Sequence, residues 1–142
     1  SGKLNGGSRM FFLMSIKPKY AAMILAGEKT VEIRKSKLHA NHGDVVAIYS
    51  TQPEGRIVGY FTVDNVLWDE TEVLWESIRI SSGLSHEEYL QYANKREMMC
   101  GIMIASVTSI DGLGLGKINM HIPQSYRRIT VEEFNFLCNR EL

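Results

Sequence analysis

A short segment of the chain carries the side chains best suited to chemistry. Lys29, Thr30, Glu32 and Arg34 occur within six residues, and Lys17 lies shortly before them. In an extended strand Glu32 and Arg34 share one face, roughly 7 Å apart. A carboxylate accepts from an exocyclic amine and a guanidinium donates to carbonyl or phosphate oxygens, so the pair suits a small planar ligand such as the edge of a base. The alternative is a solvated polar sheet face with an ordinary cross-strand ion pair.

A second polar cluster, Pro-Gln-Ser-Tyr-Arg-Arg, occupies residues 123–128, which we expect to form a loop. In the functional interpretation, a base stacks on Tyr126 while Arg127 or Arg128 meets a phosphate. The alternative is a surface loop anchored by a half-buried tyrosine.

Other motifs are weaker. The glycines of residues 112–117 match no phosphate-binding spacing and predict a flexible hairpin or loop. The four histidines and two cysteines lack metal-ligand spacing, so we expect buried free thiols, no metal and no cofactor. No Gly-x-Ser-x-Gly nucleophile motif is present. The aromatic residues of the segment 68–92 are expected to pack in the core, although one exposed ring could stack a base.

Capping signals and apolar periodicity position these groups. Pro18 begins a helix that Gly27 ends, and two Ser/Thr-x-x-Glu boxes, at Ser85 and Thr130, begin two more helices. A further helix is predicted at 70–80, and residues 11–16 form an apolar run. Strands are predicted at 30–35, 45–50, 56–65 and 99–110, with the second and third paired. The pattern is rich in strands, and its helices are grouped rather than alternating with them. It therefore favours an α+β fold with a mainly antiparallel, curved sheet or small barrel.

Length and composition set the class of protein. The chain has 142 residues and 44% hydrophobic content, which suits one domain over residues 10–142, preceded by an expression linker at 1–9. No apolar run approaches the roughly 20 residues of a membrane span, and no signal-peptide pattern is present, so we expect a cytoplasmic protein. Net charge is zero, with seven basic and four acidic residues in 10–60 but three basic and eight acidic in 64–97. Any contact with RNA should therefore be local and salt-sensitive.

Five segments in order resemble an ASCH domain, from Met10 to about Ile129. They are Ser-Ile-Lys-Pro-Lys-Tyr at 15–20, Gly-x-Lys-Thr-Val-Glu-x-Arg at 27–34, the strand around Gly59, Ser-Gly-Leu-Ser with Glu-Glu-Tyr at 82–89, and Pro-Gln-Ser-Tyr-Arg at 123–127. The resemblance implies a PUA-like, small, mainly antiparallel β-barrel with flanking helices. It also implies binding of RNA or a modified nucleotide, in RNA processing or transcriptional coactivation.

The family's cleft is bordered by the strand that carries the Lys, Glu and Arg. By this likeness, and from the two clusters above, the candidate nucleic-acid-binding residues are Lys17, Lys29, Glu32, Arg34, Tyr49, Ser50, Ser125, Tyr126 and Arg127.

Some members of the family are similar to enzymes. One branch hydrolyses acetylated cytidine with the Lys of this element, a Thr three residues later and a helical Glu; another is a ribonuclease. Lys29 matches, but Glu32 occupies the Thr position, and Glu87 or Glu88 matches the helical acid only loosely. Binding is therefore favoured over hydrolysis, in which Lys29 would act as a desolvated base and Glu32 or a helical Glu would shuttle its proton. A protein-interaction adaptor using the acidic helical region is a third hypothesis; the oligomeric state is left open.

Overall fold

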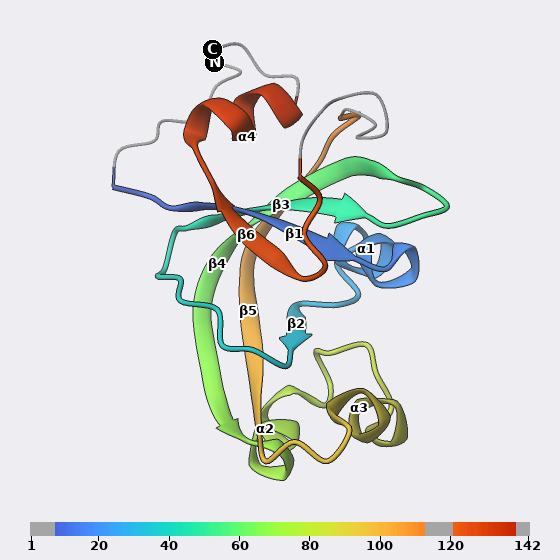
Figure 1. Ribbon diagram of the computed structural model, residues 1–142. Coiled ribbons are helices and arrows are strands. Elements are labelled where there is room, and N and C mark those ends of the chain that lie inside the picture. Colours follow the sequence, from blue (N-terminus) through green and yellow to red (C-terminus); the bar gives the residue numbers. More distant parts are fainter. Residues whose placement is uncertain (1–7, 113–120, 139–142) are drawn as a thin grey trace.

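The computed structural model describes residues 8–112 and 121–138. Their elements, in chain order, are β1 (Phe11–Ile16), α1 (Pro18–Leu25), β2 (Val31–Arg34), β3 (Val45–Ser50), β4 (Arg56–Glu70), α2 (Thr71–Ile78), α3 (His86–Ala93), β5 (Met98–Ser109), β6 (Tyr126–Ile129) and α4 (Val131–Leu137). Figure 1 shows α2 and α3 together at one end of the molecule and α4 at the other.

The helix boundaries follow the capping signals in the sequence. α1 begins at Pro18, and Gly27, with φ of +79°, lies just beyond its end. A complete capping box formed by Ser85 and Glu88 begins α3. A second box, formed by Thr130 and Glu133, begins α4. These predictions are confirmed.

The described strands form one mixed sheet in the order β2-β5-β4-β3-β1-β6. β1 and β3 are parallel, and the other neighbouring pairs are antiparallel. The predicted α+β class and the pairing of β3 with β4 are confirmed. The barrel is not confirmed, because β2 and β6 remain as the two edges of an open sheet.

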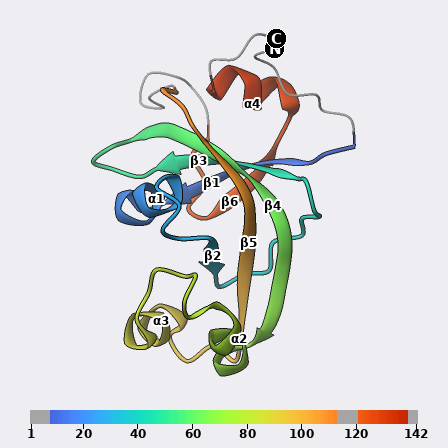
Figure 2. The same ribbon diagram turned by 180° about the vertical axis from the view of Figure 1, so that it is seen from behind.

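The longest strands curve through the whole molecule. β4 runs to Glu70, five residues beyond the predicted end, because it pairs with β5 along that length. Their register shifts between Thr62 and Asn65, which is typical of a strand that bends. Figure 2 shows the two curved strands side by side, leading down to α2 and α3.

The loop predicted at residues 123–128 was wrong at 126–128. These residues belong to β6, which pairs antiparallel with β1, Phe11 opposite Ile129. The glycine-rich segment predicted at 112–117 lies outside the described residues, apart from Gly112.

Three apolar clusters hold the elements in place. On β1, Phe12 packs in one cluster with Ile24 of α1, and its neighbour Phe11 packs in another with Phe134 of α4. Since neighbouring residues of a strand point to opposite faces, α1 and α4 cover opposite faces of the sheet. The third cluster joins α2 and α3 to Val31 and Ile33 of β2. The alternate residues of β2, Glu32 and Arg34, therefore point away from this third cluster.

Candidate functional site

The turn after α1 and the first residues of β2 set the position of Lys29. Its backbone N–H donates to the Met23 carbonyl at 3.2 Å, and the N–H of Thr30 donates to the Ser81 carbonyl at 2.9 Å. The second bond docks the turn that follows α2 against the start of β2. This contact brings the carbonyl of Ser82 to the Lys29 side chain.

On β2, alternation places Glu32 and Arg34 opposite the buried Val31 and Ile33, as predicted. Both polar side chains are nevertheless buried, Glu32 being 5% exposed and Arg34 8%. The solvated polar face that was the alternative interpretation is therefore wrong, because segments distant in the sequence cover this face.

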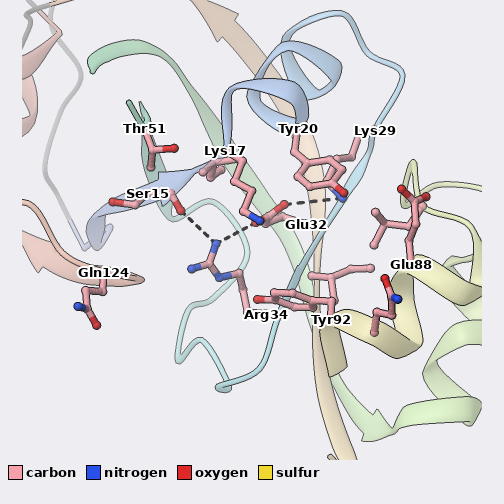
Figure 3. Close-up of a pocket in the computed structure, with 14 residues that line it drawn as sticks. Ser15, Lys17, Tyr20, Lys29, Glu32, Arg34, Thr51, Glu88, Tyr92 and Gln124 are labelled. Atoms are coloured by element: carbon pink, nitrogen blue, oxygen red, sulfur yellow. Dashed lines mark hydrogen bonds and ion pairs between the residues drawn. The ribbon is translucent and has the colours of Figure 1, made fainter. Parts of the chain in front are cut away.

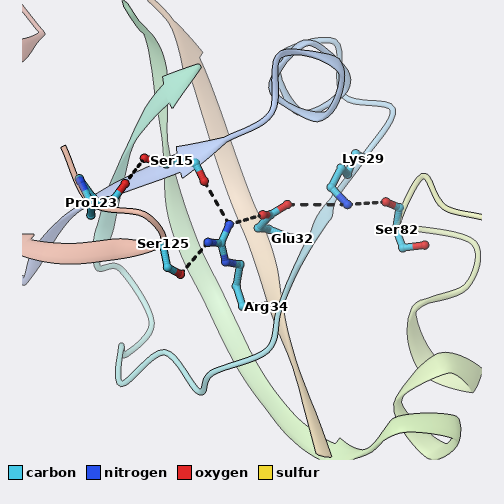
Figure 4. A network of polar contacts seen from close by, with 7 residues as sticks. All are labelled: Ser15, Lys29, Glu32, Arg34, Ser82, Pro123 and Ser125. Atoms are coloured by element: carbon cyan, nitrogen blue, oxygen red, sulfur yellow. Dashed lines mark hydrogen bonds and ion pairs between the residues drawn. The ribbon is translucent and has the colours of Figure 1, made fainter. Parts of the chain in front are cut away.

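Lys29, Glu32 and Arg34 form a connected polar row. One carboxylate oxygen of Glu32, Oε2, accepts a hydrogen bond from Arg34 Nη1 at 3.0 Å, and the other, Oε1, lies 3.7 Å from Lys29 Nζ. Figure 4 shows the carboxylate between the two cations. Two positive groups thus compensate the buried negative charge.

Lys29 is almost fully buried, with 2% of its surface exposed. Its Nζ donates to the Ser82 carbonyl at 2.5 Å and lies 5.2 Å from the ring centroid of Tyr20. Loss of solvent on burial lowers the pKa of Lys29, and the charge of Glu32 opposes that shift only in part. The structure therefore holds a cation whose proton is easier to remove than that of an ordinary lysine.

Arg34 links the two edges of the sheet. Nη1 also donates to the Ser15 carbonyl on β1 at 3.2 Å, and Nη2 donates to Ser125 Oγ, next to β6, at 2.7 Å. The side chain thus spans the opening between β2 and the β1–β6 edge. Among the described residues its buried Nε has no hydrogen-bond partner. Arg34 therefore connects β2 to β1 and to the segment before β6, and its side chain also lines the site.

The polar row borders an open pocket of about 600 Å³, within the range of roughly 300–1,000 Å³ typical of small-ligand sites. Figure 3 shows its side chains converging from β1, α1, β2 and α3. The lining residues are Ser15, Ile16, Lys17, Tyr20, Lys29, Glu32, Ile33, Arg34, Thr51, Leu84, Glu88, Gln91, Tyr92 and Gln124. Lys17 is exposed and places a cation at the rim of the pocket.

Four of the predicted binding residues, Lys17, Lys29, Glu32 and Arg34, line this one pocket. Glu88, the loosely matching helical acid, lines it as well. Ser125 reaches it indirectly through its bond to Arg34. The predicted site residues did not include Tyr20, Thr51, Gln91 or Gln124. Tyr92 and Trp68 belonged to the aromatic group predicted to pack in the core, but each is 37% exposed, so that prediction was wrong for these two rings.

The other predicted residues lie elsewhere. Tyr49 is buried in the cluster beneath α4, and Ser50, fully buried, donates to Glu54. The Tyr126 hydroxyl donates to the Lys37 carbonyl. Arg127 donates to the His121 carbonyl and lies 3.8 Å from Glu133 on α4. These four side chains do not line the pocket.

Neither a metal centre nor a membrane helix is found in the part of the chain that the structure describes. Across residues 8–112 and 121–138, no three His, Cys, Asp or Glu side chains are grouped closely enough to hold a metal ion. In the same residues, no helix is long and apolar enough to cross a bilayer. Cys100 and Cys138 are both buried, as predicted.

Comparisons with known proteins agree on one family. The sequence model of the ASCH domain matches residues 14–109. An ASCH domain-containing ribonuclease from Zymomonas mobilis is 24% identical over 126 residues, covering 85% of each chain. The crystal structure of ASCH from Zymomonas mobilis has a TM-score of 0.84 at 23% identity, covering 92% of this chain and 96% of its own. A tyrosine-to-phenylalanine variant of the Zymomonas protein also gives 0.84, at 21% identity, covering 94% and 100%. This chain therefore belongs to the ASCH domain family.

Proposed function

We propose that the pocket binds single-stranded RNA, taking one nucleotide of the strand. The observation that carries this proposal is the burial of Glu32 between Lys29 and Arg34 at the bottom of a pocket large enough for a nucleotide. Family membership and a relative named as a ribonuclease support RNA as the ligand. In this role the protein recognises RNA in RNA processing or transcriptional coactivation.

The chemistry of the pocket fits a base better than a phosphate. Glu32 accepts from a base N–H, and Lys29 has a donor left over after its bond to Ser82. A phosphate at the same depth would meet the Glu32 carboxylate, whereas Lys17 at the exposed rim offers it a cation. The protein then contacts few phosphates. The logarithm of the binding constant should therefore fall only modestly with the logarithm of the salt concentration, by about 0.7 per contacted phosphate.

Fluorescence anisotropy with short, labelled single-stranded RNA at low salt tests this proposal. We expect wild-type binding that Glu32→Gln weakens by about tenfold, because the amide replaces the carboxylate as acceptor. Glu76→Gln is the matched control, since that carboxylate is 77% exposed on α2, and it should leave affinity unchanged. Failure of the wild-type protein to bind any RNA would refute the proposal.

RNA cleavage is the second candidate, favoured by the buried Lys29. Its lowered pKa makes a neutral amine more available as a general base, and the Zymomonas relative is named a ribonuclease. Neutral Lys29 would take the proton of a ribose 2′-hydroxyl as that oxygen attacks the adjacent phosphorus. The bond from phosphorus to the 5′-oxygen would break, leaving a 2′,3′-cyclic phosphate, and Glu32 would pass the proton from Lys29 to the departing 5′-oxygen.

Labelled RNA, with its 2′-deoxy counterpart as control, decides between binding and cleavage. If Lys29 catalyses RNA cleavage, the wild-type protein should give products from RNA but none from the 2′-deoxy strand. Lys29→Ala should give no products from either. Products that persist in Lys29→Ala would point to a contaminant. Acetylated cytidine as substrate tests the amidohydrolase alternative. No turnover is expected, because Glu32 occupies the position where that branch has a hydroxyl, and the exposed Thr30 is two residues away.

A further inference from the structure

Two tyrosine rings enter the pocket from different helices. Tyr20 comes from α1 and Tyr92 from α3, and both line the pocket. Figure 3 shows the rings above and below the level of the Lys29–Glu32 pair. The described residues include no ring contact between Tyr20 and Tyr92, and both rings line the same pocket. We call these two residues the tyrosine clamp.

Core packing does not account for the position of Tyr92. The buried residues of α3 are Tyr89 and Ala93, and Tyr89 stacks on Trp75 with ring centroids 5.0 Å apart. Tyr92 lies beside this core face with 37% of its surface exposed. Lys35 Nζ lies 5.0 Å from the ring centroid of Tyr92, and the ring lines the pocket while Tyr89 and Ala93 supply the packing of α3.

The two rings lie next to the polar row. Lys29 Nζ is 5.2 Å from the centroid of Tyr20. Tyr92 lines the same pocket as Arg34 and Glu32, and burial raises the pKa of its hydroxyl. A planar ligand entering between the rings would therefore bring its edge to Glu32 and Lys29.

We propose that the pocket takes one unstacked base, edge first, between Tyr20 and Tyr92, and leaves its phosphates at the rim near Lys17. This inference deepens the proposed RNA binding and depends on it. Stacking on aromatic rings tolerates every base because each has a π-face. Bases inside a duplex are already stacked and paired, so the clamp selects single strands.

The test compares RNA probes of equal length that differ only in their bases. The intact strand should bind at least about tenfold more tightly than a fully abasic strand, as stacking contributes that much for one base. A single 2-aminopurine in the strand should lose fluorescence on binding. A perfectly paired duplex of the same sequence should bind weakly.

Variants of the clamp provide the second arm. Tyr92→Ala should weaken binding by about tenfold and abolish the 2-aminopurine quenching, whereas Tyr92→Phe and Tyr20→Phe, which keep the ring, should bind within about twofold of wild type. Phe136→Ala removes an aromatic side chain that is 48% exposed on α4 and should change nothing. Equal affinity for intact and abasic strands would overturn the clamp while RNA binding stands. Absence of binding to every probe would overturn both proposals.

Discussion

Replacing Arg34 should destabilise the protein more than any exposed arginine does. Its buried guanidinium makes three hydrogen bonds, to the Ser15 carbonyl, Glu32 and Ser125. Arg34→Met keeps the apolar stem, removes all three bonds and leaves Glu32 with Lys29 at 3.7 Å. Removing one partner of a buried ion pair costs about 3–5 kcal/mol. Because Lys29 still compensates part of the charge, we expect a loss of about 3 kcal/mol.

Urea unfolding followed by circular dichroism measures this change, with an unaltered m-value as the sign of two-state behaviour. Arg79→Met is the matched control, since Arg79 is 56% exposed and only 4.0 Å from Glu76, and it should cost less than about 1 kcal/mol. The double variant Arg34→Met/Glu32→Gln should lose less than the sum of its single changes, with a coupling of about 1–3 kcal/mol. A loss from Arg34→Met no larger than that of the control, or strict additivity, would refute the reasoning.

Two further predictions concern Lys29 and the turn beside it. Because burial lowers the pKa of Lys29, the unfolded chain binds more protons than the folded protein between that lowered pKa and the ordinary value of 10.5. This lysine therefore makes the free energy of unfolding rise with pH across that window. Urea titrations at alkaline pH should show a rise that Lys29→Met lacks; identical pH slopes would contradict it. Gly83→Ala and Gly27→Ala, at φ of +73° and +79°, should each cost about 1–2 kcal/mol in thermal unfolding. Only Gly83→Ala should also weaken RNA binding, because relief of the strain at its positive φ shifts the adjacent Ser82 carbonyl that holds Lys29. The Met23 methyl that the new Cβ would meet can move aside. Equal affinities would count against this.

Local signals in the sequence predicted the helices and the two faces of β2. A capping box such as Ser85 with Glu88 is complete within four residues, and the alternation that pairs Glu32 with Arg34 needs only the strand itself. β6 was missed because Tyr-Arg-Arg-Ile lacks a clear apolar alternation. Its pairing depends on β1, more than a hundred residues earlier in the chain.

For the same reason, local sequence patterns could not predict that the site is buried. The bonds that cover the polar row join Lys29 to Ser82, 53 positions away, and Arg34 to Ser125, 91 positions away. Tyr92 enters from α3, whose own sequence predicts only an amphipathic helix. The strand could thus be predicted, but the pocket depends on long-range packing.

The most direct test of the proposed site is to map where RNA binds. An NMR titration of the ¹⁵N-labelled protein with short single-stranded RNA reports on every backbone amide. We predict that the shifts gather at the pocket, on residues 15–20, 29–34 and 91–92, and that α4 and its neighbour Arg127 stay unchanged. Shifts that gather at Arg127 and α4 instead, or none at saturating RNA, would contradict the assignment of the pocket as the RNA-binding site.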